Sequence, residues 1–456
     1  MTKINKLMFR EYDIRGIYGE DLTPDIAYLV GRAFATKLTE LNKKDTIVGY
    51  DNRHSSVPLM QELVKGLQEG GINVHLLGLV TTPMYYFSWD YLNIKCGIMI
   101  TASHNPKEYN GFKFSYNGIH NTYGKDVYEL YEIIEKGQFS EGKGSLTHHD
   151  VKDAYIELLT KDIHLTDRPL KVIFDCGNGT TSIVAKDVFQ KLNITSTPLF
   201  AESDPDFPNH HPDPCVEENL KQLKEKVISE QANIGVAYDG DGDRVWVVDE
   251  KGNMIETDKF MIIIWRNIYN KVTKKKALYD VKCSKSLEDE LIKLGIEPVC
   301  YRTGNSYTKA EVVRGDYPFG GEYSGHVYFR DRFPGYDDGI YASLRLIEIL
   351  SNTNKEVSEL LEGITKYYST KELKLEVNDA HKEEFINKVK EYCLNKNYQI
   401  LTIDGIKVLF DDGFALIRAS NTGPNITYRY EAKTEARLKE ISTEFNNLLT
   451  KIKEGE

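Results

Sequence analysis

The chain has 456 residues, of which 41% are hydrophobic and 28% are charged. This composition excludes wholesale disorder and supplies apolar residues for several cores, since one domain takes roughly 150 residues. The net charge of −11 argues against binding to nucleic acid or to an anionic membrane, because both partners require basic patches. It does not exclude an anionic substrate, which a local cluster of Arg and Lys can bind inside an acidic protein.

Six cysteines are scattered along the chain without CxxC spacing, which predicts reduced thiols and no zinc site. The N-terminal residues lack the apolar segment of a signal peptide. The longest apolar runs, such as residues 260–265, are too short to span a bilayer. We therefore expect a cytoplasmic protein with no membrane partner.

One pattern recurs three times along the first part of the chain: a buried strand, a helix and a second strand. These elements are expected at 46–50, 57–69 and 72–77, at 171–174, 182–192 and 194–199, and at 277–281, 287–294 and 297–301. Apolar runs that alternate with helices are typical of βαβ units and parallel sheets. The repetition predicts an α/β fold class with three related α/β domains.

The C-terminal part of the chain has a different pattern. Strands are expected at 369–379, 399–403, 406–409, 414–419 and 426–431, with helices at 381–392 and 435–449. Strands grouped together, with helices at either end, predict a small α+β domain. The expected division of the chain is therefore 1–149, 150–253, 254–367 and 368–456.

The first candidate motif is TASHNP at 101–106. It follows the apolar strand expected at 96–100, so Ser103 lies where a strand ends and a loop begins. A serine in that place is a candidate nucleophile, although the motif is not the GxSxG elbow of an α/β-hydrolase. The alternative interpretation is a polar turn closed by Asn-Pro.

The second motif is DGDGDR, in which Asp239, Asp241 and Asp243 alternate with glycines and precede Arg244. Three uncompensated carboxylates on one loop repel each other, and hard oxygen ligands suit Mg²⁺ or Ca²⁺. The glycines allow a turn tight enough for the carboxylates to converge. An EF-hand is the obvious competitor, but Arg244 takes the place of the required glycine and both flanks are expected to be strands. A solvated acidic turn is the remaining alternative.

The third motif is GGEYSGH at 320–326. Glu322 and Ser324 suit the hydroxyls of a sugar, and His326 can donate a proton or contact a ligand. A structural histidine is the common alternative for a lone His.

The fourth motif is RASNTGP at 418–424, with Arg429 beyond it. Arginine, hydroxyls, an amide and glycine directly after a strand can hold a phosphate, although a surface turn is equally consistent. Two further loops, at 12–16 and 302–306, carry arginines, and Lys113 and Lys282 lie in or just after expected strands. Ligands of doubly wound sheets bind beyond the carboxyl ends of strands, so loops of all four segments could converge on one cleft.

These four motifs, in this order and at these separations, resemble those of the α-D-phosphohexomutase superfamily. The resemblance covers essentially the whole chain and is strongest to its bacterial phosphomannomutase/phosphoglucomutase branch. Further matches are FPNHHPDP at 207–214 and DVKC at 280–283. The resemblance implies three related α/β domains with mixed sheets and a C-terminal α+β domain, arranged round a central cleft.

The resemblance also implies roles for individual residues. Ser103 would be phosphorylated in the active enzyme, and its phosphate would join Asp239, Asp241 and Asp243 in holding Mg²⁺, with Arg244 beside it. His104 would orient the serine, and Lys113 or His326 would serve as general base. Further active-site and substrate-binding positions are Tyr12, Arg15, Lys282, Arg302, Thr303, Gly304, Asn305, Glu322, Tyr323, Ser324, Gly325, Arg418, Ser420, Asn421, Thr422, Gly423 and Arg429.

The implied activity interconverts the 1-phosphate and 6-phosphate of mannose and/or glucose, with hexose 1,6-bisphosphate as intermediate and activator. Partners would be small-molecule hexose phosphates, and the chain would act as a monomer or weak dimer. Four departures from the family pattern, at Arg302, Asn305, Tyr323 and Gly423, leave the preferred sugar open. The alternatives are a phosphoglucosamine mutase, a Mg²⁺-dependent sugar phosphatase and a non-catalytic binding protein.

Overall fold

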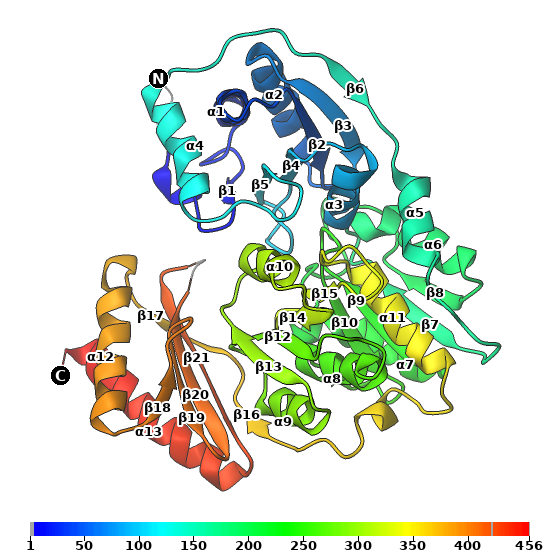
Figure 1. The fold of residues 1–456 in the computed structure, drawn as a ribbon, viewed down its shortest axis with the longest axis vertical. Coiled ribbons are helices and arrows are strands. Elements are labelled where there is room, and N and C mark those ends of the chain that lie inside the picture. The colour runs from blue at the N-terminus through cyan, green and yellow to red at the C-terminus, as the bar shows by residue number, and fades with distance from the viewer. Residues whose placement is uncertain (1–3, 421–422, 456) are drawn as a thin grey trace. The chain divides into compact units, whose positions relative to one another are not determined.

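The computed structural model describes residues 4–420 and 423–455. These residues form two compact units (Figure 1). The first unit contains residues up to 256 together with 309–316 and 324–360, and the second contains 257–308, 317–323 and those from 361 onward. Each unit is described by itself.

The N-terminal sheet of the first unit has six strands in the order β1-β5-β4-β2-β3-β6. Their bounds are β1 (Ile14–Ile17), β2 (Asp45–Tyr50), β3 (Asn73–Leu79), β4 (Gly97–Ile100), β5 (Tyr109–Ser115) and β6 (Leu146–His148). Four helices belong to the same segment: α1 (Pro24–Glu40), α2 (Ser56–Glu69), α3 (Thr82–Tyr91) and α4 (Lys125–Lys136). Strand β2 is parallel to β3 and β4, whereas β5 is antiparallel to β4 and β1, so the sheet is mixed.

A second sheet in the same unit has the order β11-β10-β9-β7-β8. Its strands are β7 (Lys171–Asp175), β8 (Thr195–Leu199), β9 (Ile234–Tyr238), β10 (Val245–Asp249) and β11 (Met254–Ile255). The helices of this segment are α5 (Lys152–Thr160), α6 (Ala185–Lys191) and α7 (Lys221–Ser229), and the unit also contains β15 (Val327–Phe329) and α11 (Gly339–Ser351). Every residue of β9 and β10 is buried, so the short loop between them starts and ends inside the protein.

The second unit begins with α8 (Thr257–Ile268), followed by β12 (Lys276–Asp280), α9 (Lys285–Lys293), β13 (Glu297–Tyr301) and, further along, β14 (Phe319–Gly321). Strand β12 lies parallel to both β13 and β14. Helix α10 (Asn305–Arg314) contributes residues to both units. Short 3₁₀ helices complete the chain: η1 (Lys6–Met8), η2 (Thr180–Ile183), η3 (Glu217–Leu220), η4 (Ser358–Leu361) and η5 (Asp379–His381).

The C-terminal segment of the second unit is an antiparallel sheet with two helices. Its strands run in the order β16-β21-β20-β19-β18, and β17 also pairs with β21. The bounds are β16 (Tyr368–Ser369), β17 (Leu373–Glu376), β18 (Gln399–Leu401), β19 (Ile406–Phe410), β20 (Gly413–Ala419), β21 (Asn425–Ala432), α12 (Lys382–Asn395) and α13 (Glu435–Glu454). Val389 of α12 and Phe445 of α13 pack with Val408, Ile417 and Tyr430 of the strands in one core.

The expected α/β class, with three α/β segments and a C-terminal α+β segment, is confirmed. Two expected elements differ. The helix at 182–192 is interrupted, because Val184 adopts φ −139° between η2 and α6. The strand expected at 369–379 is divided into β16 and β17, which pair with different parts of β21. No helix in the described part of the chain is long and apolar enough to cross a membrane.

A buried acid caps helix α11. Asp338 accepts hydrogen bonds from the Tyr341 N–H at 2.9 Å and from the Tyr155 hydroxyl at 2.6 Å. Asp338 is buried, with only 2% of its surface exposed. Burial raises the pKa of Asp338 to about 7, although the hydrogen bond from Tyr155 opposes the shift. The folded chain therefore holds a proton here that the unfolded chain releases at lower pH.

We predict that Asp338→Asn removes one source of alkaline instability. The wild-type carboxyl favours the folded state most below its ordinary pKa, and that contribution is lost as the pH rises through about 7, at about 1.4 kcal/mol per pKa unit. Asparagine keeps the oxygen that caps Tyr341 and can donate to Tyr155. The variant should therefore lose less Tm than the wild type between pH 5 and pH 8 in thermal unfolding. Equal losses would contradict the prediction.

Candidate active site

Three aspartates converge on the loop between β9 and β10. Asp239, Asp241 and Asp243 are buried, and one carboxylate oxygen of each lies within 4.8 Å of the others. Gly242 has φ +80°, which permits the turn, and a Cβ at Gly240 would lie 2.5 Å from the main-chain oxygen of Ser103. The two glycines therefore allow both the tight loop and the close approach of the serine.

Ser103 lies directly beyond β4, with its side chain beside this acidic loop. Its Oγ donates a hydrogen bond to Asp239 Oδ2 at 2.9 Å and lies 3.2 Å from His104 Nδ1. Its N–H donates to Thr101 Oγ1 at 2.8 Å. Its φ is +52°, in the left-handed region that residues with a Cβ rarely adopt. The structure thus brings together the serine and acidic motifs, which are more than 130 positions apart in sequence.

Two cations compensate the carboxylates, so the expectation that the three carboxylates are uncompensated was wrong. Lys113 Nζ lies 2.8 Å from Asp241 Oδ2 and 2.9 Å from Asp243 Oδ2. Arg244 Nε donates to Asp239 Oδ2 at 2.9 Å. Burial alone would lower the pKa of Lys113, but the two carboxylates outweigh it and raise that pKa above its ordinary value. The negative charge of the carboxylates is therefore partly compensated, because β5 places Lys113 against Asp241 and Asp243.

The acidic loop nevertheless fits a divalent cation. Asp241 Oδ1 and Asp243 Oδ1 are buried and have no hydrogen-bond partner among the described residues. Three carboxylates face two cationic side chains, and oxygen ligands of this kind suit Mg²⁺. Burial raises the pKa of Asp239 to about 7, against the opposing effect of Arg244. Binding of a cation here would therefore be coupled to release of a proton.

His326 is anchored next to this loop by residues that the sequence did not single out. Its Nδ1 lies 2.7 Å from Asp337 Oδ2 and 3.6 Å from Asp243 Oδ1. Asp337 Oδ1 lies 2.7 Å from Lys309 Nζ, and the side chains of both are fully buried. Lys309 Nζ is also 3.3 Å from the centre of the Tyr86 ring. The histidine is thus oriented by a buried ion pair.

Three further predicted residues of the first unit are His104, next to Ser103, Tyr12, just before β1, and Arg15, within β1. Burial, and next the charge of Arg244, hold the pKa of His104 well below its ordinary value, so its imidazole is neutral. Arg15 NH1 donates to Asn105 Oδ1 at 2.8 Å, and its NH2 pairs with Asp13 at 2.6 Å. Tyr12 is half-buried just before β1. A neutral imidazole 3.2 Å from Ser103 Oγ can orient the hydroxyl.

In the second unit, the end of β12 joins two of the predicted loops. Asp280 accepts hydrogen bonds from the Tyr323 N–H and from Thr303 Oγ1, each at 3.1 Å. Glu322 Oε2 accepts the Gly304 N–H at 3.1 Å, and Glu322 is only 1% exposed. The loop at 302–305 and the motif at 320–326 are therefore linked by hydrogen bonds, directly and through Asp280. In the first unit, the Ser324 carbonyl accepts from Arg244 NH1 at 3.3 Å and the Gly325 carbonyl accepts from the Val245 N–H.

The arginines and lysine proposed to hold phosphate all have partners within the second unit. Arg418 NH2 lies 3.0 Å from Asp404 Oδ2, and Lys282 Nζ lies 3.4 Å from Glu372 Oε2. Arg429 NH1 donates to the Lys282 carbonyl at 2.6 Å. Any anion that binds these side chains must therefore compete with Asp404 and Glu372.

Aromatic rings cover two of the arginines. Arg429 lies 4.2 Å from the ring centre of Tyr323, and Arg302 lies 3.8 Å from that of Tyr307. Tyr323, in the motif at 320–326, thus makes a cation–π contact with Arg429, which follows the motif at 418–424. Asn305 begins α10.

The loop between β20 and β21 carries the rest of the phosphate motif. The Ser420 N–H donates to the Asn425 carbonyl at 2.9 Å, and the Gly423 carbonyl accepts from Lys382. Asn421 and Thr422 lie outside the described residues. The described ends of the loop are therefore fixed by main-chain and lysine hydrogen bonds.

The predicted residues fall into two groups. The first unit holds Tyr12, Arg15, Ser103, His104, Lys113, Asp239, Asp241, Asp243, Arg244, Ser324, Gly325 and His326. The second unit holds Lys282, Arg302, Thr303, Gly304, Asn305, Glu322, Tyr323, Arg418, Ser420, Gly423 and Arg429.

Sequence reasoning missed Arg53, Lys309, Asp337 and Asp404. Of these four, only Arg53 could have been found from the sequence, because it closely follows the buried strand β2, at the carboxyl end where ligands bind in such sheets. The other three are recognisable only once the fold has brought their partners beside them.

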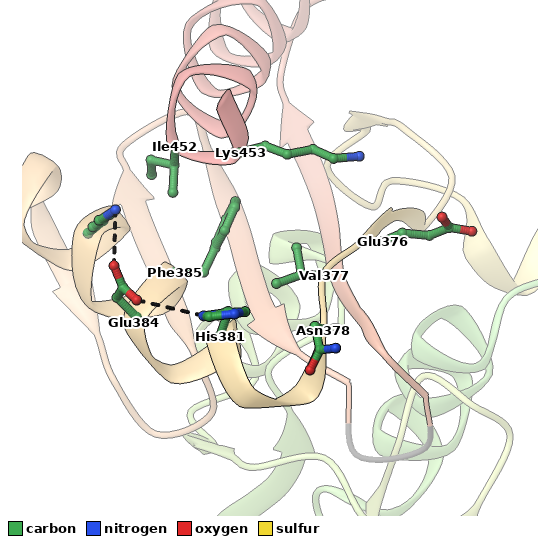
Figure 2. Close-up of a pocket in the computed structure, with 9 residues that line it drawn as sticks. Glu376, Val377, Asn378, His381, Glu384, Phe385, Ile452 and Lys453 are labelled. Atoms are coloured by element: carbon green, nitrogen blue, oxygen red, sulfur yellow. Dashed lines mark ion pairs between the residues drawn. The ribbon is translucent and has the colours of Figure 1, made fainter. Parts of the chain in front are cut away.

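A pocket in the C-terminal segment contains none of these residues (Figure 2). Its volume is about 330 Å³, and it lies among β17, α12 and the end of α13. Three of its charged side chains form ion pairs, since Glu384 lies 3.1 Å from Lys388 and 3.9 Å from His381 (Figure 2). None of the lining residues belongs to the candidate site.

Comparison with known proteins agrees with the four-segment division of the fold. Models of phosphoglucomutase/phosphomannomutase alpha/beta/alpha domains I, II and III match residues 6–141, 153–252 and 256–368, and the model of the C-terminal domain matches 372–448. A phosphomannomutase/phosphoglucomutase of Pseudomonas syringae is 38% identical over 445 residues, which cover 98% of this chain and 95% of that protein.

Two further relatives cover nearly the whole chain. A phosphoglucomutase of Neisseria gonorrhoeae is 38% identical, with 98% of each chain covered. The crystal structure of a phosphoglucomutase/phosphomannomutase family protein from Burkholderia thailandensis superposes with a TM-score of 0.92 at 36% identity, covering 99% of this chain and 98% of that one. On these matches, the chain belongs to the phosphoglucomutase/phosphomannomutase family.

Proposed function

We propose that the chain is a phosphohexomutase that interconverts the 1-phosphate and 6-phosphate of a hexose, mannose and/or glucose, through a phosphoserine and a hexose 1,6-bisphosphate. The observation that carries the proposal is Ser103, whose Oγ donates to Asp239 within a buried acidic loop flanked by Lys113 and Arg244. The relatives at 35–38% identity are named phosphomannomutase/phosphoglucomutase or phosphoglucomutase, which favours this activity over a phosphoglucosamine mutase or a phosphatase.

The reaction uses Ser103 as a carrier of the phosphoryl group. The bond between phosphorus and Ser103 Oγ breaks as a bond forms to the free hydroxyl of the hexose monophosphate, and the hydroxyl proton passes to a base. The bisphosphate then presents its other phosphate, which returns to Ser103 Oγ while the sugar oxygen regains a proton. Phosphoryl transfer requires positioning and charge stabilisation more than covalent chemistry, and the site consists of groups that supply both.

The acidic loop would hold Mg²⁺ through Asp239, Asp241, Asp243 and the serine phosphate. When bound, the ion would neutralise charge on the phosphoryl group. Arg244, fixed by Asp239, lies beside Ser103 and would stabilise the same charge. Lys113 would keep Asp241 and Asp243 in place and contribute further positive charge.

Geometry favours His326 over Lys113 as the general base. Lys113 Nζ donates to both Asp241 and Asp243, so its nitrogen is engaged as a cation. His326 is held through Nδ1 by Asp337, which fixes the ring, and Nε2 would be the nitrogen that exchanges the proton. His104 would orient Ser103, as its neutral ring and 3.2 Å contact suggest.

Other predicted residues would bind the substrate. Glu322 and Ser324 would bind sugar hydroxyls, supported by Thr303, Gly304, Tyr323 and Gly325. The non-reacting phosphate would be held by Lys282, Arg418, Ser420, Asn421, Thr422, Gly423 and Arg429. Arg302, Asn305, Tyr12 and Arg15 would complete the set of substrate contacts. The domain division at 149, 253 and 367, a cytoplasmic location and a monomeric or weakly dimeric state belong to the same proposal.

The direct test is a mutase assay with Mg²⁺ and a trace of glucose 1,6-bisphosphate. Glucose 1-phosphate, mannose 1-phosphate and glucosamine 1-phosphate are supplied separately, and both 6-phosphate and free phosphate are measured. We expect 6-phosphate without free phosphate from glucose or mannose 1-phosphate, and the ratio of kcat/KM values then gives the preferred sugar. Free phosphate alone would replace the mutase with a phosphatase.

Ser103→Ala is expected to abolish turnover, because Ser103 Oγ is the group that would carry the phosphoryl group. We predict a loss of kcat of at least about 10³-fold. Ser88→Ala is the matched control: Ser88 is also buried in the first unit, but it donates only to the Tyr85 carbonyl. Retention of wild-type activity by Ser103→Ala would overturn the phosphoserine route.

Metal binding can be tested without turnover. We predict that isothermal titration calorimetry detects Mg²⁺ binding to the wild type, and that Asp241→Asn weakens it by at least about 10-fold, since one ligand loses its charge. Asp249→Asn serves as the control, because Asp249 is a buried acid at the far end of β10 from the loop, and its carboxylate accepts hydrogen bonds from Lys251 and Asn253 in its own turn. Equal affinities of wild type and Asp241→Asn would remove Asp241 from the metal site.

A further inference from the structure

A buried arginine, Arg53, binds the main chain of the loop that carries Ser103. Arg53 NH2 donates to the main-chain carbonyls of Ser103 at 2.9 Å and Asn105 at 2.7 Å. Its NH1 donates to those of Pro106 at 2.6 Å and Tyr109 at 3.2 Å. The Arg53 side chain is only 1% exposed. One guanidinium therefore binds four main-chain carbonyls between residues 103 and 109.

The arginine is itself rigidly held. Asp51 Oδ2 accepts from Arg53 Nε at 3.1 Å, and Asp51 Oδ1 accepts from the Arg53 N–H and from Ser56 Oγ. The Asp51 N–H donates to the Ile100 carbonyl, which ties the end of β2 to the end of β4. The ring of Phe207 lies 5.5 Å from the guanidinium. Arg53 is thus fixed to the same central strands that carry the serine loop.

The serine needs such support because of its backbone conformation. At φ +52°, Ser103 lies where a Cβ is sterically unfavourable, and such conformations persist only where the surroundings over-determine them. Arg53 binds the Ser103 carbonyl itself and that of Asn105, two residues on. The conformation that these bonds hold is the one that directs Ser103 Oγ to Asp239 at 2.9 Å.

We propose that Arg53 is a positioning residue for phosphoryl transfer, which holds the main chain of residues 103–109 so that Ser103 Oγ faces the acidic loop. The inference rests on the proposed function. Arg53 acts through the loop and does not contact the sugar phosphate. Its loss should therefore slow the chemical step, which depends on alignment, and leave substrate binding by the other loops nearly unchanged.

The chain offers a close structural match for a control. Arg168 NH1 donates to the main-chain carbonyls of Leu350, Thr353 and Lys355, and its NH2 pairs with Glu356 at 2.7 Å. It thus holds a loop in the same unit by the same chemistry. None of the residues that it contacts belongs to the candidate site. A role confined to folding would be shared by both arginines.

The experiment compares Arg53→Lys with Arg168→Lys in the full chain. A lysine cannot reach four carbonyls from one planar group. We expect Arg53→Lys to lower kcat by roughly 10- to 100-fold with KM changed less than about 3-fold, and Arg168→Lys to lower Tm with kcat unchanged. An unchanged kcat in Arg53→Lys, or an equal loss in both variants, would overturn the inference.

Asp51→Asn keeps the test decisive if Arg53→Lys does not fold. Asparagine retains the oxygen that faces Ser56 and the main chain but removes the charge that orients Arg53 Nε. We expect a smaller fall in kcat, again with little change in KM, and an unchanged kcat would count against the proposal. Absence of turnover by the wild type on all three sugar phosphates would overturn the proposed function and this inference together, whereas a fully active Arg53→Lys beside an active wild type overturns the inference alone.

Discussion

The site of the first unit depends on a balance of charge inside the protein. Asp239, Asp241 and Asp243 are buried at the end of β9, where unpaired carboxylates would be costly. Lys113 and Arg244 reduce that cost but leave an excess of negative charge, so the loop can be both stable and receptive to a cation. Because Asp239 also accepts from Ser103, the same balance places the serine.

The strands of the fold were predictable because they are short apolar runs between turn residues. The βαβ order and the α+β character of the C-terminal part follow from that pattern alone. The helix expected at 182–192 was wrong in one detail, since Val184 leaves the helical region for reasons that periodicity does not record. The strand at 369–379 was predicted as one strand, whereas β16 and β17 pair separately with β21, a partner that lies far along the sequence.

The candidate site was predictable where chemistry is local. Ser103 and the acidic loop are contiguous motifs, and each follows a strand, so the sequence places them at a sheet edge. The assumption that the carboxylates lack compensation failed because Lys113 is more than 120 positions away from them. Asp337 and Lys309 were not found for a related reason: their roles consist of contacts that only tertiary structure creates.

The paired cations of the second unit have a consequence for turnover. Arg418 and Lys282 already interact with Asp404 and Glu372, so under the proposed function a phosphate would have to compete with these carboxylates. Such competition would make the net free energy of phosphate binding less favourable than binding to unpaired cations. In the proposed mutase the bisphosphate must leave one orientation and adopt the other, and an anchor weakened by the protein's own carboxylates would release it more readily.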